Sequence, residues 1–224
     1  LKKHLSAKGH SVSVGDEGGF APNLGRSEEV LETIITSIEE IGLVYLDDIS
    51  IALDCAASEL YQDSSYHLAG EDKILSNDQM VEYITKLSKK YEIRSIEDPF
   101  DETDWDSWKK FTKLNDSLQI VGDDIFVTQE EILKKGIDEG AANSILIKLN
   151  QVGTLSETMK TISLAKEHNF GTVISHRSGE TEDTFIADLA VAVDAKQIKT
   201  GAPARSDRTA KYNRLLIIED ELYP

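Results

Sequence analysis

Short apolar runs rich in β-branched residues alternate with amphipathic windows along most of the chain. The runs predict six strands, at residues 50–54, 95–97, 119–123, 144–148, 172–176 and 197–199. The windows predict helices at about 76–90, 104–115, 128–139, 153–168, 182–193 and 207–215. This repeated strand–helix order predicts an α/β domain with a parallel sheet, right-handed crossovers and cover on both faces. The pattern leaves open whether the sheet closes into a barrel.

The segment before the first predicted strand carries one more helix and an unusual loop. Residues 27–41 have helical periodicity, with Ser27 as the expected N-cap and two acids in the first turn. The loop before them, residues 15–23, reads GDEGGFAPN. No linker or low-complexity tract interrupts the chain, so residues 1–224 are interpreted as one domain.

Composition excludes several classes of function and location. The net charge is −17 and no basic cluster is present, which argues against nucleic-acid binding and against anionic membranes. Cys55 is the only cysteine, which favours a reducing compartment and hence the cytoplasm. No apolar stretch is long enough for a membrane span or a signal peptide. Because the chain does not start with Met, we expect it to be a piece of a longer protein.

The most informative feature is that every predicted strand ends on an ionisable residue. These residues, in chain order, are Asp54, Glu97, Asp123, Lys148, His176 and Lys199. They follow one another at about one strand–helix unit, so their side chains are expected to meet at the carboxyl-end rim of the sheet. A charge at one strand end is unremarkable, because strand ends meet solvent, but six in succession predict a site.

The first three strand-end residues are carboxylates, which would repel one another unless a cation lies between them. An all-oxygen donor set without cysteine favours Mg²⁺. Lys148, poorly solvated and close to the metal, is a candidate general base. An ion pair between Lys148 and Asp123 is the alternative, and the sequence leaves it open.

Seven segments carry a resemblance to a known family. They are GDEGGFAPN at 15–23, IALD at 51–54, SIEDPF at 95–100, VGDD at 121–124, IKLNQ at 147–151, VISHRSGETED at 173–183 and KTGAPARS at 199–206. The chain resembles the enolases, the phosphopyruvate hydratases. The resemblance implies the C-terminal catalytic part of a (β/α)8 TIM barrel, with about six strand–helix units in residues 1–224 and with the upstream domain and first strands absent.

The resemblance also implies a reaction: the reversible, Mg²⁺-dependent dehydration of 2-phosphoglycerate to phosphoenolpyruvate in glycolysis, through a metal-stabilised ene-diolate. Two Mg²⁺ ions are expected in the complete site, one of them held by Asp54, Glu97 and Asp123. Lys148 is implied as the base that removes the C2 proton, and Glu17 as the acid that protonates the departing C3 hydroxyl.

The remaining implied roles concern substrate binding. Arg177 and Ser178 resemble the phosphate contacts, with Ser178 near the second Mg²⁺. His176 would bind or orient substrate, and Lys199 would neutralise the dianion. Two structural alternatives stay open: residues 178–183 also fit a helix entry with acids in its first turn, and the glycines around Glu17 also fit a simple turn.

Two other kinds of function are alternatives to this one. A muconate-cycloisomerase or mandelate-racemase type of barrel would share the three acids but not the SHRSGET segment. A truncated or moonlighting enolase piece acting as a binding protein is the non-enzymatic alternative. The missing upstream part would supply a loop for the second Mg²⁺, so we expect the piece alone to be poorly active. The complete enzyme is expected to be a homo-oligomer, with a cell-surface or secreted fraction besides the cytoplasmic one.

Overall fold

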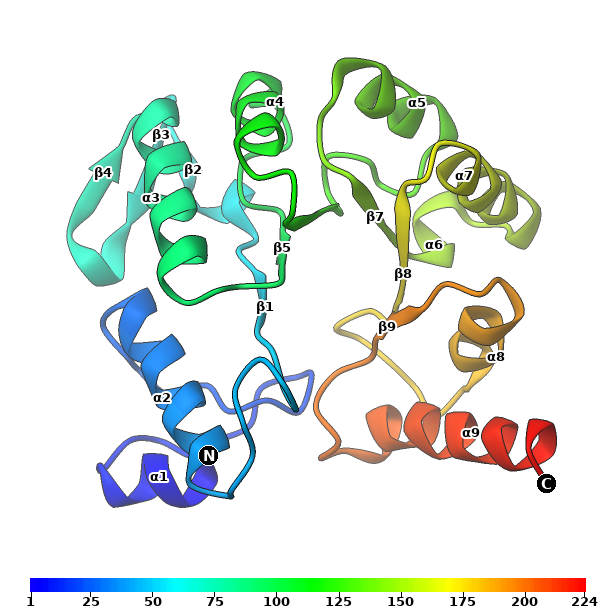
Figure 1. The fold of residues 1–224 in the computed structure, drawn as a ribbon, viewed down its shortest axis with the longest axis horizontal. Helices are drawn as coiled ribbons and strands as arrows, with labels where there is room; N and C mark the ends of the chain where they lie inside the picture. Colours follow the sequence, from blue (N-terminus) through cyan, green and yellow to red (C-terminus); the bar gives the residue numbers. More distant parts are fainter.

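The computed structural model describes residues 1–224, and its main element is a six-stranded parallel sheet. The strand order is β1–β5–β6–β7–β8–β9, so each strand pairs with the next one predicted along the chain. The strands are β1 (Ala52–Asp54), β5 (Ser95–Glu97), β6 (Gln119–Gly122), β7 (Ser144–Ile147), β8 (Gly171–Ser175) and β9 (Gln197–Lys199). Figure 1 shows them curving round a common centre with the helices outside. The predicted parallel α/β fold is confirmed as a half-barrel whose edge strands are β1 and β9.

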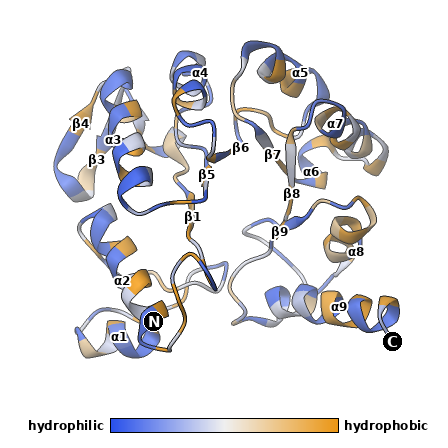
Figure 2. Ribbon diagram, viewed as in Figure 1, coloured by the Kyte–Doolittle hydropathy of each residue, from blue (hydrophilic) through white to orange (hydrophobic).

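A helix follows each strand, as predicted, and covers the outer face of the sheet (Figure 1). These helices are α3 (Asn77–Lys90), α4 (Trp105–Leu114), α5 (Glu130–Glu139), α7 (Leu155–Glu167), α8 (Phe185–Ala192) and α9 (Ser206–Leu222). A short helix, α6 (Leu149–Val152), directly follows β7. The last helix extends seven residues beyond the predicted end at 215. Figure 2 shows hydrophobic and hydrophilic residues mixed along α3, α4 and α5, as expected for helices with one buried face.

The N-terminal part contains α1 (Lys2–Ala7) and α2 (Ser27–Glu39). The expectation that Ser27 caps α2 is wrong: the N-cap is Arg26, and no side chain caps the helix. The backbone N–H of Ser27 instead donates to Oε1 of Glu71 at 3.0 Å. A carboxylate from a distant segment thus satisfies a free N–H of the first turn, which explains why the local sequence signal misplaced the cap.

Between β1 and α3 lies an antiparallel sheet that the sequence pattern did not predict. It consists of β2 (Tyr61–Gln62), β3 (Ser65–Leu68) and β4 (Lys73–Leu75), with 3-10 turns η1 (Ala57–Leu60) and η2 (Ala69–Glu71) beside it. Asp63 and Ser64 join β2 to β3 with positive φ angles of 50° and 59°. Two such residues form the tight hairpin turn whose twist matches the strands, although neither is glycine.

The core lies between the sheet and its helices. In it Phe100 packs edge-on against Trp108 and Phe111, and all three side chains are buried. Phe126 fills the space left by two glycines, Gly122 at the end of β6 and Gly136 on α5. None of the helices is both long and apolar enough to cross a lipid bilayer. The core holds the strands in place and sets the positions of the residues that follow them.

Candidate active site

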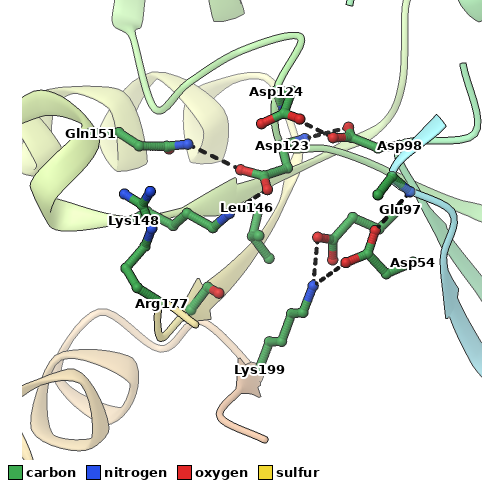
Figure 3. A network of polar contacts seen from close by, with 12 residues as sticks. Asp54, Glu97, Asp98, Asp123, Asp124, Leu146, Lys148, Gln151, Arg177 and Lys199 are labelled. Carbon is green, nitrogen blue, oxygen red and sulfur yellow. Dashed lines mark hydrogen bonds and ion pairs between the residues drawn. The ribbon is translucent and has the colours of Figure 1, made fainter. Parts of the chain in front are cut away.

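The six ionisable residues predicted at the strand ends lie at one rim of the half-barrel. Asp54, Glu97 and Lys199 are the last residues of β1, β5 and β9. Asp123, Lys148 and His176 come directly after β6, β7 and β8, so these three strands end one residue earlier than predicted. Because the strands are parallel, their carboxyl ends face the same side, and the predicted clustering is observed. Figure 3 shows these residues apart from His176.

Lys199 lies between two of the carboxylates. Its Nζ is 2.7 Å from Oδ2 of Asp54 and 2.7 Å from Oε1 of Glu97. Burial and the negative charge of Asp54 raise the pKa of Glu97 to about 8. Burial opposes charge on Lys199 as well, but the two carboxylates together hold its pKa above the usual range. The two carboxylates therefore favour a positively charged group at this position.

Lys148 contacts the third carboxylate, Asp123, and its side chain is only 15% exposed. The ion pair that the sequence left open is therefore present. Gln151 on α6 also donates to Asp123, from Nε2 to Oδ1 at 3.2 Å, and receives a hydrogen bond from Thr128. Asp123 thus accepts hydrogen bonds from Lys148, directly after β7, and from Gln151 on α6.

Sequence reasoning missed Asp98, which lies beside these acids. Its two carboxylate oxygens accept the backbone N–H groups of Asp123 and Asp124, at 2.8 and 2.9 Å. Oxygens of Asp98, Asp123 and Asp124 lie within 4.8 Å of one another and form a group that could hold a metal ion. Burial raises the pKa of Asp98 to about 7. The signal available in the sequence was its place directly after Glu97, a predicted strand end.

A second group of polar residues forms around Glu17, which the GDEGGFAPN loop carries to the rim. Ser178 donates from Oγ to Oε1 of Glu17 at 3.1 Å. Nε2 of the buried His176 is 3.3 Å from the other oxygen, Oε2, without the alignment of a hydrogen bond. Burial lowers the pKa of His176, and the charge of Glu17 acts in the opposite direction. Two residues from the loop after β8 thus face a carboxylate that lies 161 residues earlier in the chain than Ser178.

A family model described as the enolase C-terminal TIM barrel domain matches residues 1–223. The chain belongs to this family. The predicted resemblance is therefore confirmed, and the half-barrel is the enolase barrel domain.

In this enolase domain residues 178–183 of the VISHRSGETED segment form no helix. The interpretation of residues 178–183 as a helix entry is wrong, because α8 starts at Phe185 with Thr184 as its N-cap. Asp183 accepts the N–H of Phe185 at 2.9 Å, so the start of the helix is satisfied without Ser178. Arg177 donates from Nη1 to Oδ1 of Asn150 at 2.9 Å.

The donor chemistry of the enolase domain fits the metal that its family implies. Asp54, Glu97 and Asp123 offer hard oxygen donors from three adjacent strands. In this structure lysine ammonium groups lie against all three, Lys199 on the first two and Lys148 on the third. Three carboxylates gathered at one rim favour positive charge between them, and a divalent ion would supply it.

Proposed function

We propose that this enolase domain carries the catalytic residues of a Mg²⁺-dependent lyase that reversibly dehydrates 2-phosphoglycerate to phosphoenolpyruvate in glycolysis. The observation that carries the proposal is that one rim holds both a candidate base and a candidate acid. The base is Lys148, directly after β7, and the acid is Glu17, which lies against His176, directly after β8. Each is held by different neighbours. An elimination that removes a proton from one carbon and a hydroxyl from the next needs two such separate groups.

Asp54, Glu97 and Asp123 are the residues proposed to hold Mg²⁺. Asp98 is the less suitable ligand, because both of its oxygens already accept backbone N–H groups. A second Mg²⁺ is proposed near Ser178. When bound, the metal ions would supply positive charge that stabilises the negative charge developing on the substrate carboxylate.

Lys148 is proposed to remove the C2 proton. A proton beside a carboxylate is very weakly acidic, so its removal needs a base at close range and a charged environment that favours the product. The ion pair of Lys148 with Asp123 keeps its amine at the rim. Lys199, with its strongly favoured positive charge, is proposed to stabilise the ene-diolate formed on the substrate.

Glu17 is proposed to protonate the C3 hydroxyl as it leaves. Its contacts with Ser178 and His176 fix the carboxyl group against the loop that would bind the phosphate. Arg177 and Ser178 are proposed to contact that phosphate, the first through its planar fork and the second through its hydroxyl. His176, whose Nε2 is buried without a hydrogen bond, is proposed to bind or orient substrate.

The proposal is tested by turnover. The full-length protein is purified, freed of metal with EDTA and assayed for phosphoenolpyruvate formation with and without added Mg²⁺. We expect activity that depends on Mg²⁺, together with exchange of the C2 proton with solvent. A folded protein that shows neither would contradict the proposal and favour the alternative of a binding protein.

The physiological setting is part of the same proposal. A glycolytic reaction and a single free cysteine favour the cytoplasm. We propose a small-molecule partner only, with no nucleic acid, and a homo-oligomeric complete enzyme. Size-exclusion chromatography with light scattering on the full-length protein tests the oligomeric state.

A further inference from the structure

Arg208, on the first turn of α9, is a charged side chain with no exposed surface. Its guanidinium donates to three backbone carbonyls: Nη1 to Arg177 at 2.8 Å, Nη2 to Ser178 at 2.7 Å and Nη2 to Asp16 at 3.1 Å. Burying a charge is costly unless it is fully compensated. The compensation here comes from these carbonyls of the two loops that carry the candidate substrate and acid residues, and from Oδ2 of Asp207, which lies 3.2 Å from Nε. Arg208 therefore links these two loops through hydrogen bonds to their backbone carbonyls.

The same guanidinium contacts Nδ1 of His176 through Nη1. An arginine can only donate hydrogen bonds, so Nδ1 of the imidazole must be the acceptor and must carry no proton. The proton of the neutral ring is then on Nε2, the atom that faces Oε2 of Glu17 at 3.3 Å. The contact with Arg208 thus determines that the nitrogen of His176 that carries the proton is the one facing the acid.

Close packing around this contact leaves it little freedom. Gly201 has a φ of +79°, and a Cβ at that position would lie 2.8 Å from Cδ of Arg208 and 2.6 Å from the backbone oxygen of Glu17. The same oxygen of Glu17 accepts the N–H of Ala202 at 2.9 Å. The loop after β9 is therefore in close contact with both Arg208 and the Glu17 loop.

We propose that Arg208 is a positioning residue that fixes His176 in the Nε2–H tautomer and holds the Glu17 loop in register with the Arg177–Ser178 loop. This inference rests on the proposed function and extends it to a residue behind the site. Arg208 acts on the acid side of the reaction and has no hydrogen bond or ion pair with Lys148 or Asp123. Its loss should therefore impair release of the C3 hydroxyl more than exchange of the C2 proton.

The tautomer is measured directly by ¹⁵N NMR of the full-length protein labelled on histidine, with the His176 signals assigned by their loss in His176→Gln. We expect wild-type His176 to be neutral with the proton on Nε2. In Arg208→Met we expect a mixture of tautomers, about a 10–100-fold loss of kcat for dehydration, and a clearly smaller loss of C2 proton exchange.

Lys211→Met is the matched control, because Lys211 is also a buried cation on α9 and lies one turn further on. It donates to the backbone oxygens of Thr181 and Asp207 and does not touch His176. We expect it to lower stability without changing the tautomer. If Arg208→Met does not fold, Arg208→Lys replaces it, with one donor group in place of the fork.

Two results would overturn the proposal: wild-type His176 with its proton on Nδ1, or an Arg208 variant that keeps both the tautomer and the ratio of exchange to dehydration. The wild-type spectrum decides the first point without any variant. An Nε2–H tautomer in a protein that has no turnover would instead count against the proposed function and leave the contact itself established.

Discussion

The ammonium group of Lys199 lies 2.7 Å from a carboxylate oxygen of Asp54, although the two residues belong to the opposite edge strands of the sheet. They are 145 residues apart in the chain. No backbone hydrogen bonds join β9 to β1, so at the rim a side-chain ion pair bridges the two edges. The curvature of the half-barrel therefore brings the ends of β1 and β9 within reach of each other at the rim, as the contact of Asp54 with Lys199 in Figure 3 shows.

The choice of metal ligands can be tested by comparing two single-charge removals, Asp54→Asn and Asp124→Asn. Asp54 belongs only to the proposed set, and Asp124 belongs only to the group formed with Asp98. We expect Asp54→Asn to weaken Mg²⁺ binding at least about tenfold and Asp124→Asn to change it by less than about threefold. Calorimetric titration of the full-length protein measures both. The reverse order of effects would assign the metal to the Asp98 group.

The base and acid roles are separable by isotope exchange. Lys148→Ala should abolish exchange of the C2 proton with solvent, because the other amine at the rim, Lys199, is held in its charged form by Asp54 and Glu97 and cannot accept the proton. Glu17→Gln should leave exchange largely intact and stop release of the C3 hydroxyl. Exchange is followed by NMR in deuterated water, with substrate binding checked separately. Loss of exchange in Glu17→Gln with intact binding would remove the acid role from Glu17.

Gly136→Ala should destabilise the domain, although alanine in a helix normally stabilises by about 1 kcal/mol relative to glycine. A Cβ at this position would lie 2.3 Å from Cε1 of the buried Phe126. We expect a loss of about 1–3 kcal/mol in the free energy of unfolding, measured by urea denaturation. Phe126→Leu in the same chain should recover part of the loss beyond additivity. Additive effects would mean that the ring does not oppose the new methyl group.

Glu71 should make stability depend on pH in the acid range. Burial opposes its charge, but hydrogen bonds from Lys73, the backbone N–H of Ser27 and Tyr83 lower the pKa of this carboxyl to about 2. Because the folded-state pKa is the lower one, the stabilisation is complete above the unfolded-state pKa of 4.5 and is lost as the pH falls toward 2. The side chain is only 9% exposed, so the contribution is about 1–3 kcal/mol.

The matching experiment compares Glu71→Gln with wild type by urea unfolding between pH 6 and the lowest pH at which both fold. The difference in unfolding free energy should shrink as the pH falls. Glu102→Gln serves as the control, because Glu102 is exposed and its carboxylate forms no ion pair. A difference for Glu71→Gln that is constant with pH would show that the carboxylate contributes through shape rather than charge.

Much of the fold was predictable because its signals are local. An apolar run that ends on a charged residue marks a strand end, and this identified Asp54, Glu97 and Lys199 without knowledge of their neighbours. The strands β2 to β4 gave no such signal. They are short, and the hydroxyl of Tyr66 on β3 is fixed by Asp104 at 2.8 Å, a contact from a distant segment. Tertiary contacts, rather than periodicity, determine that small sheet.

The site was predictable in part for the same reason. The strand-end residues follow from the pattern, but Asp98 and Arg208 act through backbone atoms of other segments. In the sequence Arg208 is one of several charges on the last helix and resembles an exposed residue of an amphipathic surface. Only the fold shows that the two loops converge on it. Motifs and spacing therefore do not identify residues whose role is to position other residues.

Lys199→Met should make the stability of the domain depend more strongly on Mg²⁺. Removal of the ammonium leaves Asp54 and Glu97 without the cation between them, so ionising both costs the repulsion that, with burial, already raises the pKa of Glu97 to about 8. Mg²⁺ binds only the folded rim, so it stabilises by mass action, and the variant has more repulsion for it to relieve. We expect the rise in Tm on adding Mg²⁺ to be larger in Lys199→Met than in wild type, as measured by calorimetry of the full-length protein against an EDTA control. Lys196→Met is the matched control, because Lys196 pairs with Asp194 on the surface and its side chain is exposed. An equal rise in all three proteins would mean that Lys199 does not share its carboxylates with the metal, and the proposed ligand set would then lose both Asp54 and Glu97.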